Sequence, residues 1–309
     1  MVGSAPLGPA APAGGWALEY GDGFGAPLGT APGQDNTVWP SRVTSNCANN
    51  PGFNGNELEV FNCSQVGTDA NGLELNCSRA AGLTKPFSCG AITTVTHAGS
   101  PPPAGYRLFN FIPGQGQEWA MQIVTRFPPS TGDADPGWWA TTPTWRWEWD
   151  MFEGWGATAG AGGSWCQPGK YVGTTDPTFI YSTSSGAMVQ AVNDFCKDFG
   201  FDPSAGYHTY TTVMYPDRSM AEWVDGRQVV YTSGPKGAQT LVGPPAVQAV
   251  MGGLIVSYSL RNVAVGSTDP YFPAGMRNWS TRSIAVYENA TAGGANTVNP
   301  GIAPGTQVR

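Results

Sequence analysis

The chain has 309 residues, enough for one large all-β domain or two small ones. Its 43 glycines and 27 prolines, against 12% charged residues, favour many turns and short strands over helices. The net charge of −7 and the pI near 4.8 argue against nucleic acids and anionic membrane surfaces, which select basic proteins. No apolar run approaches the roughly 20 residues of a membrane helix, and no signal peptide precedes the first strand. We expect a soluble, secreted protein.

The cysteine content indicates disulfides rather than a metal site. The six cysteines are Cys47, Cys63, Cys77, Cys89, Cys166 and Cys196. An even number without a C-x-x-C pair, beside only two histidines, disfavours a zinc site and suits an oxidising compartment. Fifteen pairings are open, and we expect bonds within the group at 47–89 and between the last two cysteines.

The first half of the chain predicts a series of short strands. Residues 1–14 are rich in alanine, proline and glycine and are expected to form a flexible lead. Strands are predicted at 16–24, 56–61, 73–77, 88–94, 106–111 and 119–127. Asn71-Gly72 is a hairpin signal between two of them. The next stretch, 133–139, contains the aromatic pair Trp138-Trp139, of which we expect one ring in the core and one lining a cleft.

The stretch 145–156 organises the chain. Its tryptophans and its charged residues alternate, which predicts a strand with one buried face and one acidic face. Glu153 breaks this alternation and would point into the core, at a high cost for an unpaired carboxylate. A β-bulge at Met151-Phe152 would restore it to the face of Glu148 and Asp150. We therefore predict a bulged strand that carries three carboxylates on one face.

The second half predicts further strands and a loop. The glycine-rich stretch 156–177 is expected to be a loop. Residues 187–199 are expected to form either a short helix or, as we favour, an irregular loop held by Cys166 and Cys196. Strands are predicted at 207–215, 221–230, 249–260 and 283–288, with Asp225-Gly226 as a hairpin turn. A tail at 291–309 is expected to be flexible. No internal repeat appears, so we expect one domain over residues 15–290.

The predicted acidic face suits a retaining glycosidase. With the bulge counted out, Glu148 and Glu153 lie four strand steps apart, about 13 Å between Cα atoms at about 3.3 Å per residue. Side chains that lean together would bring their carboxylates to about 5 Å, the separation used in double displacement. Asp150 would hydrogen-bond the nucleophile, and the three pKa values would belong to the cluster.

The six residues Glu148-Trp149-Asp150-Met151-Phe152-Glu153 resemble the bulged E-x-D-x-x-E signature of glycoside hydrolase family 16, as found in laminarinases, agarases and carrageenases. Similar motifs run from about residue 16 to 288, including Trp223-Val224-Asp225-Gly226. The resemblance implies a β-jelly-roll sandwich of two curved antiparallel sheets, related to concanavalin A. It implies Glu148 as nucleophile, Asp150 as its assistant and Glu153 as acid/base.

Five further residues are candidates for contact with substrate. Trp155, Trp138 and Trp139 are candidate stacking platforms for sugar rings. By the resemblance His208 faces the cleft near the nucleophile, although it equally suits a core or rim histidine with a hydrogen bond. Arg146 shares the acidic face and would bind substrate or, as we favour, neutralise the cluster. No cofactor is required; Asp22 and Glu19 are candidates for a structural Ca²⁺ site.

The sequence predicts a secreted, monomeric endo-glycosidase that binds a polysaccharide. By resemblance to the laminarinases, a β-1,3-glucan is the first expected substrate. A β-galactan, agar or carrageenan hydrolase and a transglycosylase remain open, since sugar choice depends on the loops at 128–139 and 156–177. A non-catalytic, lectin-like binding module is the alternative of another class. Retention of all three carboxylates argues against it.

Overall fold

In the computed structural model, the described residues are 16–24, 59–79, 81–93, 118–126, 134–141, 147–154, 173–174, 178–182, 188–191, 205–214, 220–225, 227–232, 253–260 and 277–289. Almost all of them form β-strands, apart from turns and one short 3-10 helix, η1 (Cys63–Gln65). Among these residues no helix has the length and apolar character to cross a membrane.

One sheet has ten strands, in the order β15-β14-β13-β7-β17-β4-β5-β2, with β1 beside β17 and β3 beside β4. Its strands are β1 (Ala17–Asp22), β2 (Glu59–Phe61), β3 (Val66–Asp69), β4 (Gly72–Arg79), β5 (Phe87–Cys89), β7 (Glu118–Arg126), β13 (His208–Met214), β14 (Met220–Val224), β15 (Arg227–Thr232) and β17 (Arg277–Asn289). All neighbours are antiparallel except β2 and β5, which are parallel. The expected antiparallel sheet is therefore a mixed one.

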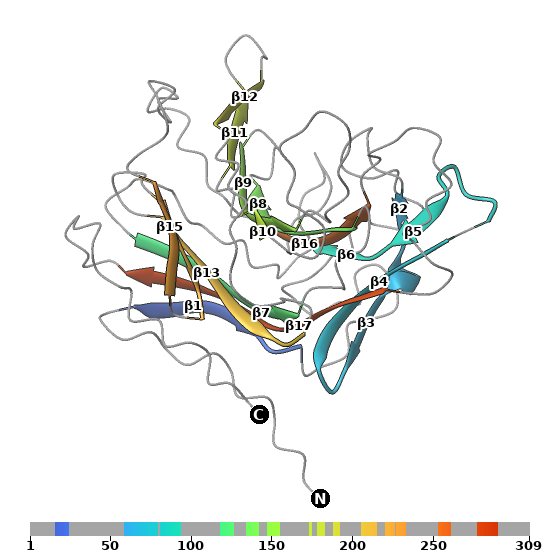
Figure 1. The fold of residues 1–309 in the computed structure, drawn as a ribbon, viewed down its shortest axis with the longest axis horizontal. Coiled ribbons are helices and arrows are strands. Elements are labelled where there is room, and N and C mark those ends of the chain that lie inside the picture. The colour runs from blue at the N-terminus through green and yellow to red at the C-terminus, as the bar shows by residue number, and fades with distance from the viewer. Residues whose placement is uncertain are drawn as a thin grey trace, which may run out of the picture.

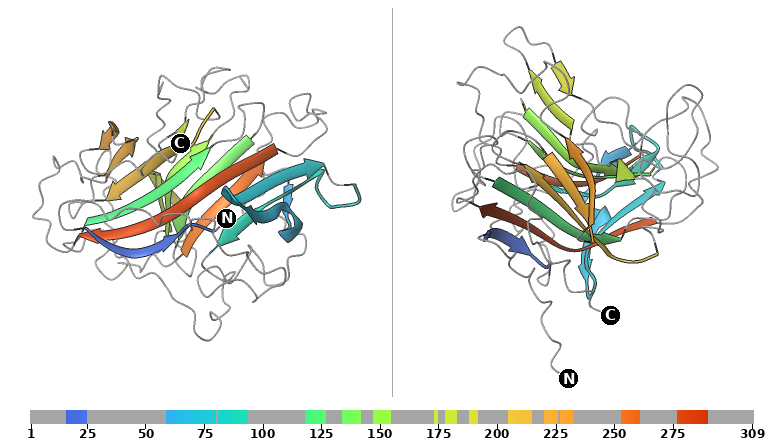
Figure 2. Two further views of the ribbon diagram at one scale, coloured as in Figure 1. Left: turned by 90° about the horizontal axis from the view of Figure 1, so that it is seen from below. Right: turned by 60° about the vertical axis from the view of Figure 1, so that its left-hand side comes forward.

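The other sheet has seven strands, in the order β12-β11-β9-β8-β16-β6, with β10 beside β9. Its strands are β6 (Ala91–Thr93), β8 (Ala134–Thr141), β9 (Trp147–Gly154), β10 (Gly173–Thr174), β11 (Thr178–Ser182), β12 (Met188–Ala191) and β16 (Gly253–Leu260). Figure 1 shows this sheet stacked on the ten-stranded one, with β11 and β12 rising at its far end. In Figure 2 the long strands β1, β17, β7 and β13 run side by side and bend together. The predicted jelly-roll sandwich is confirmed.

Several predicted elements differ from the observed ones. The hairpin at Asn71-Gly72 is present, but its first strand is β3 rather than 56–61, because β2 pairs with β5 instead. The backbone N–H of Asn71 donates to Oδ1 of Asp69 at 2.6 Å, which shapes the turn. Within 187–199, residues 188–191 form strand β12 against β11, so both the favoured irregular loop and the alternative helix are wrong for these four residues. The rest of this stretch lies outside the described residues. The predicted strand at 106–111 lies outside the described residues.

The core of the ten-stranded sheet collects on one face of β4, β17 and β7. Alternate residues of these strands are almost fully buried: Leu73, Leu75, Trp279, Ile284, Met121 and Ile123. Thr125 is a polar member of this face, and its hydroxyl donates to the carbonyl of Ser280 at 2.9 Å. The same hydroxyl accepts the indole N–H of Trp279 at 2.6 Å. The buried hydroxyl of Thr125 and the indole N–H of Trp279 are thus paired within the core.

The opposite face of the same strands carries a chain of polar contacts. Ser280 on β17 lies between Glu74 on β4 and Arg126 on β7. Its hydroxyl donates to Oε1 of Glu74 and also contacts the hydroxyl of Tyr207. The guanidinium carbons of Arg282 and Arg126 lie 3.9 and 5.4 Å from the centre of the Tyr207 ring. These five residues, which we call the tyrosine network, tie β4, β17 and β7 to the residue before β13.

The chain changes sheets at Gly90. The sequence predicts a single strand over 88–94, whereas β5 belongs to the ten-stranded sheet and β6 to the seven-stranded one. A Cβ at Gly90 would lie 2.4 Å from the carbonyl oxygen of Gln65, so no side chain fits at this crossing. The N–H of Gly90 donates to the carbonyl of Asn76 at 3.0 Å, which holds the crossing against β4.

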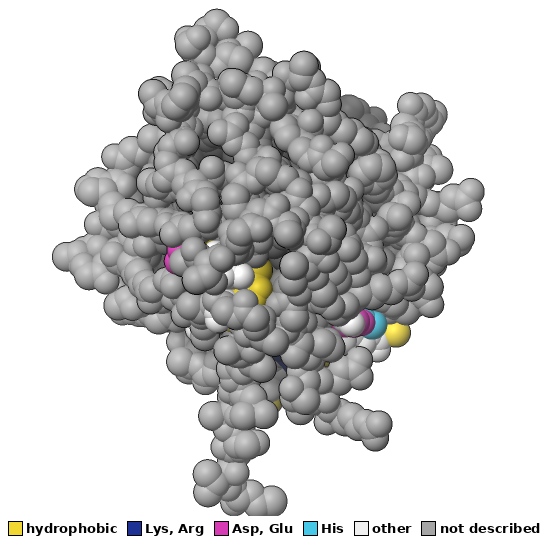
Figure 3. Space-filling view, turned by 90° about the vertical axis from the view of Figure 1, so that its left-hand side faces the viewer, with side chains coloured by type: hydrophobic (Ala, Val, Ile, Leu, Met, Phe, Trp, Pro, Cys, Tyr) yellow, Lys and Arg dark blue, Asp and Glu magenta, His cyan; other side chains and the backbone are white. Residues whose placement is uncertain are grey.

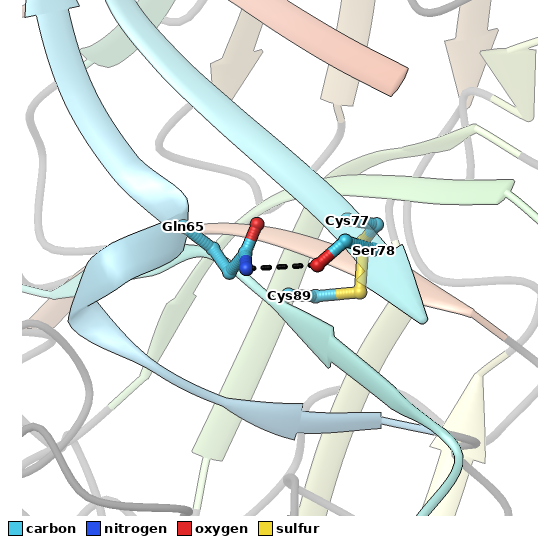
Figure 4. Close-up of a disulfide and its surroundings, with 4 residues drawn as sticks. All are labelled: Gln65, Cys77, Ser78 and Cys89. Carbon is cyan, nitrogen blue, oxygen red and sulfur yellow. Dashed lines mark hydrogen bonds between the residues drawn. A yellow bond between two sulfur atoms is a disulfide. The ribbon is translucent and has the colours of Figure 1, made fainter. Parts of the chain in front are cut away.

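A disulfide lies directly beside this crossing. Cys77 on β4 and Cys89 on β5 are cross-strand partners joined by a bond, as Figure 4 shows. Close by, Nε2 of Gln65 donates to the hydroxyl of Ser78 at 2.9 Å. The expected pairing within the first cysteine group is confirmed for these two residues. The bond fixes the chain just before β6, which pairs with β16 and, through β8, leads to β9.

Candidate active site

The strand β9 contains the predicted bulge. On β8, Trp138 pairs with Phe152 and the next residue, Trp139, pairs with Asp150. Strand β9 therefore advances by two residues where β8 advances by one, and Met151 is the extra residue. The prediction of a bulge at Met151-Phe152 is confirmed. Its physical reason is the one that the sequence suggests, because a regular strand would turn Glu153 to the other face.

The bulge brings the three acidic positions to one face of the sheet. The partners of Glu148, Asp150 and Glu153 on β8 are Thr141, Trp139 and Gly137, in that order. These partners are alternate residues of a regular strand, so they share one face, and the positions paired with them share it too. The side chains of β9 are not among those described, and the chemical roles of the three acids stay predictions.

Strand β9 is hydrogen-bonded to neighbouring strands on both sides, which fixes the backbone at the three acidic positions. On the side away from β8, Asp150 pairs with Thr178 and Glu148 with Ile180 of β11, while Glu153 pairs with Thr174 of β10. Sites built on interior strands are held more accurately than sites on loops. Sequence reasoning overlooked Thr174 and Thr178, although the run of β-branched and aromatic residues at 178–182 is a strand signal.

The two neighbouring tryptophans divide between the two faces. Trp138 is 1% exposed and pairs with Phe152, on the face opposite to the acids, as a core residue would. Trp139 is 7% exposed and pairs with Asp150, on the acidic face. Both rings are buried, so the expectation that one of them lines a cleft stays a prediction. Trp139, on the acidic face, is the better candidate for a sugar-stacking platform. Trp138 lies on the opposite face and is not a candidate.

His208 lies on the other sheet, at the start of β13. Its Nδ1–H donates to Oδ2 of Asp225 at 2.6 Å, and the N–H of Thr209 donates to Oδ1 of the same carboxylate at 2.9 Å. The side chains of His208 and Asp225 are 17% and 30% exposed. Figure 3 shows a histidine and an acidic side chain next to each other at the surface. The structure thus shows a partly exposed histidine with a hydrogen bond, and a position near the nucleophile stays a prediction.

The pair has a clear electrostatic effect on Asp225. Burial alone would raise the pKa of this carboxyl, but the hydrogen bonds from His208 and from the Thr209 backbone outweigh it. The pKa of Asp225 is therefore lowered from its ordinary value, and the carboxylate stays ionised in the folded protein.

The remaining predicted site residues are not tested. Arg146 and Trp155 lie outside the described residues, as do the side chains of Asp22 and Glu19. In the part of the chain that is described, no three histidine, cysteine or acidic side chains gather as metal ligands. The calcium site stays a prediction.

Comparison with solved structures identifies the fold. An endo-glucanase of glycoside hydrolase family 16 from Bacteroides ovatus, in complex with G4G3G-2F-DNP, superposes with a TM-score of 0.60 at 15% identity, over 86% of this chain and 99% of that one. The endo-1,3-β-glucanase from Streptomyces sioyaensis gives 0.58 at 19% identity, over 90% and 98%. The chain has the fold of glycoside hydrolase family 16.

A solved agarase is equally similar. β-Agarase A in complex with oligoagarose gives a TM-score of 0.60 at 15% identity, over 88% of this chain and 92% of that one. No protein-family model matches the sequence, and no curated protein matches it either. The relationship is therefore visible in the fold, at identities too low to assign a substrate.

Proposed function

We propose that the protein is a retaining endo-glycoside hydrolase of family 16 that cleaves a β-linked polysaccharide, with β-1,3-glucan as the first candidate. The observation that carries this proposal is the bulge at Met151. It places Glu148, Asp150 and Glu153 on one face of an interior strand, in a fold shared with endo-glucanases and an agarase. A strand can carry exposed acidic residues without a bulge. A nucleophile and an acid that act on the same bond must lie on the same face, and here the bulge brings the position of Glu153 to the face of Glu148.

The proposed reaction is a double displacement. Glu148 attacks the anomeric carbon while Glu153 protonates the departing glycosidic oxygen, so that a covalent glycosyl-enzyme forms and the first product leaves. Glu153 then removes a proton from water, which attacks the same carbon and releases the sugar with retained configuration. Mutual repulsion of the carboxylates keeps the proton on Glu153, the acid, at the start of the cycle. Asp150, between them, hydrogen-bonds the nucleophile.

The even number of cysteines favours secretion of this enzyme into an oxidising compartment. It would act as a secreted monomer without a required cofactor. The endo mode agrees with the similarity to endo-glucanases and an agarase. Because that similarity includes β-agarase A, a β-galactan or agar hydrolase is the second candidate.

Substitution of the two glutamates tests the catalytic roles. Glu153→Ala should lower turnover about 10²–10⁴-fold, the usual worth of a general acid. Glu148→Ala should abolish turnover, because no covalent intermediate can form. Added azide should rescue each variant with opposite outcomes: the Glu153 variant should give a glycosyl azide of retained configuration, and the Glu148 variant one of inverted configuration. Anomeric NMR distinguishes the two products.

A control variant and a substrate panel complete the test. Asp69→Asn removes a carboxylate from the turn of the ten-stranded sheet and should leave turnover unchanged. Laminarin, lichenan, agarose, arabinogalactan and carrageenan should be offered to the wild-type protein, with sizing of products. Release of oligosaccharides from one of them supports the enzyme, while binding without release from any would leave the lectin alternative. Normal turnover in either glutamate variant would contradict its assigned role.

A further inference from the structure

Gly137 occupies an unusual position in the seven-stranded sheet. It lies in the interior of β8, is buried, and is paired on both sides. A glycine within a strand is destabilising relative to alanine, since it loses more conformational freedom on folding and has no side chain to pack. Such a glycine often marks a place where a ligand or another backbone comes close.

The register identifies the neighbour of Gly137 as Glu153, the proposed acid/base. The cross-strand neighbours of the other two acids, Thr141 for Glu148 and Trp139 for Asp150, have side chains. Directly paired residues hold their Cβ atoms about 4.5–5.5 Å apart. Any side chain at position 137 would therefore occupy the space immediately beside the acid.

Small residues continue beyond Gly137 in one direction. Beyond Gly137 the same row continues with Ser257 on β16 and Ala91 on β6, both small residues. In the adjacent row of the same face lie Trp139, Ile255 and Thr93. The row through Glu153 therefore carries only small residues toward β16, whereas the row through Asp150 carries larger ones.

We infer that Gly137 provides the space for the sugar ring on the leaving-group side of the cleaved bond. This inference rests on the proposed function. The acid must contact the oxygen that departs, so the departing sugar lies against the neighbours of Glu153. A ring that lies directly against the backbone of a strand needs that position to carry no side chain. Gly137 is then a residue that determines whether a polymer can be accepted, without taking part in proton transfer.

Two types of substrate test the inference. One is the polysaccharide that the wild-type protein cleaves, and the other is a glycosyl fluoride of the matching oligosaccharide, which has no sugar on the leaving-group side. Gly137→Val should lower kcat/KM on the polysaccharide about 100-fold, as for a misplaced substrate. Its activity on the fluoride should change little, because fluoride leaves without a sugar and needs little acid assistance.

Gly67→Val is the matched control. Gly67 lies on β3 of the ten-stranded sheet, directly opposite a glutamate, and a Cβ there meets nothing within 4 Å. Both substrates should be cleaved normally by this variant. If Gly137→Val fails to fold, as judged from circular dichroism and thermal unfolding, Gly137→Ala replaces it and is judged by the same ratio of the two activities.

The outcomes separate the inference from the proposed function. A wild-type protein that cleaves no polysaccharide and no fluoride overturns the proposed function. If the wild-type protein is active, equal losses on both substrates, or no loss on either, overturn the inference about Gly137 and leave the enzyme in place. A loss confined to the polysaccharide supports both.

Discussion

Asp225 has a φ of 49°, in the left-handed region, although it is not a glycine. Aspartate and asparagine tolerate this conformation better than most residues, since their short side chains bond the local backbone. Here the carboxylate accepts hydrogen bonds from His208 and from the backbone of Thr209, while its own N–H donates to the Thr209 carbonyl at 2.9 Å. One side chain therefore holds the β14–β15 turn against the start of β13.

The variant Asp225→Asn removes the charge and retains the tolerance for the turn. We expect the free energy of unfolding at pH 7 to fall by about 1 kcal/mol, the worth of a hydrogen bond. The pKa of Asp225 is lowered below the ordinary 3.8, so its ionised form stabilises the fold above that pH, and this stabilisation disappears as the pH falls through the lowered pKa. Urea unfolding at pH 7 and below pH 3 should show the difference shrinking. An equal difference at both pH values would attribute it to the shape of the turn.

Glu74, in the tyrosine network, shows the opposite behaviour. Burial raises its pKa above 4.5 and nearby Asp69 adds to this, while the bond from Ser280 and the charge of Arg126 act against it. Its second carboxylate oxygen, Oε2, is buried without a hydrogen-bond partner. An ionised Glu74 is therefore costly in the folded protein.

Glu74→Gln should remove this cost and keep an acceptor for Ser280. Because the folded pKa is raised, wild-type stability from this group is fully present below pH 4.5 and declines as the pH rises toward the folded pKa. We expect the glutamine variant to unfold at a higher urea concentration than the wild type at pH 7, with the advantage reduced at pH 4. A glutamine variant less stable at pH 7 would show that the ionised carboxylate is favoured, through Arg126.

Among the elements, β9 makes the sharpest prediction. Met151 is the extra residue of the bulge, so its deletion leaves Glu148, Asp150 and Glu153 opposite the same partners on β8. The strand would then read Glu148-Trp149-Asp150-Phe152-Glu153, with the acids still alternating. We expect this deletion variant to fold and to retain measurable hydrolysis, lower than that of the wild type because the local bend is lost.

Deletion of Trp149 is the matched control. It also shortens β9 by one residue but leaves the bulge, and so moves Glu148 to the opposite face from Asp150 and Glu153. Hydrolysis should be undetectable in this variant. Product sizing on the responding polysaccharide compares the two deletions. Equal inactivity, with both proteins folded, would mean that the bend itself, and not the shared face, is what the acids require.

At the scale of the whole molecule, the sequence predicts the local features and not the partners of each strand. The bulge follows from the position of one charge, and the turns at Asn71-Gly72 and Asp225-Gly226 follow from residues that favour positive φ. The change of sheet at Gly90 depends on the backbone of Gln65, far from it along the chain, so the pattern at 88–94 suggests one strand. The assignment of Trp138 and Trp139 to opposite faces also required the register of β8 with β9, because nothing in the sequence distinguishes two adjacent tryptophans.

The position of β17 affects how the protein is made. This strand, the last in chain order among those described, lies between β4 and β7 and also pairs with β1. Until residues 277–289 leave the ribosome, β4 and β7 each keep an open edge, which invites pairing with other nascent chains. Assembly of the ten-stranded sheet must therefore wait until β17 has been synthesised, and a chaperone that shields exposed strands during that interval should raise the yield of native protein.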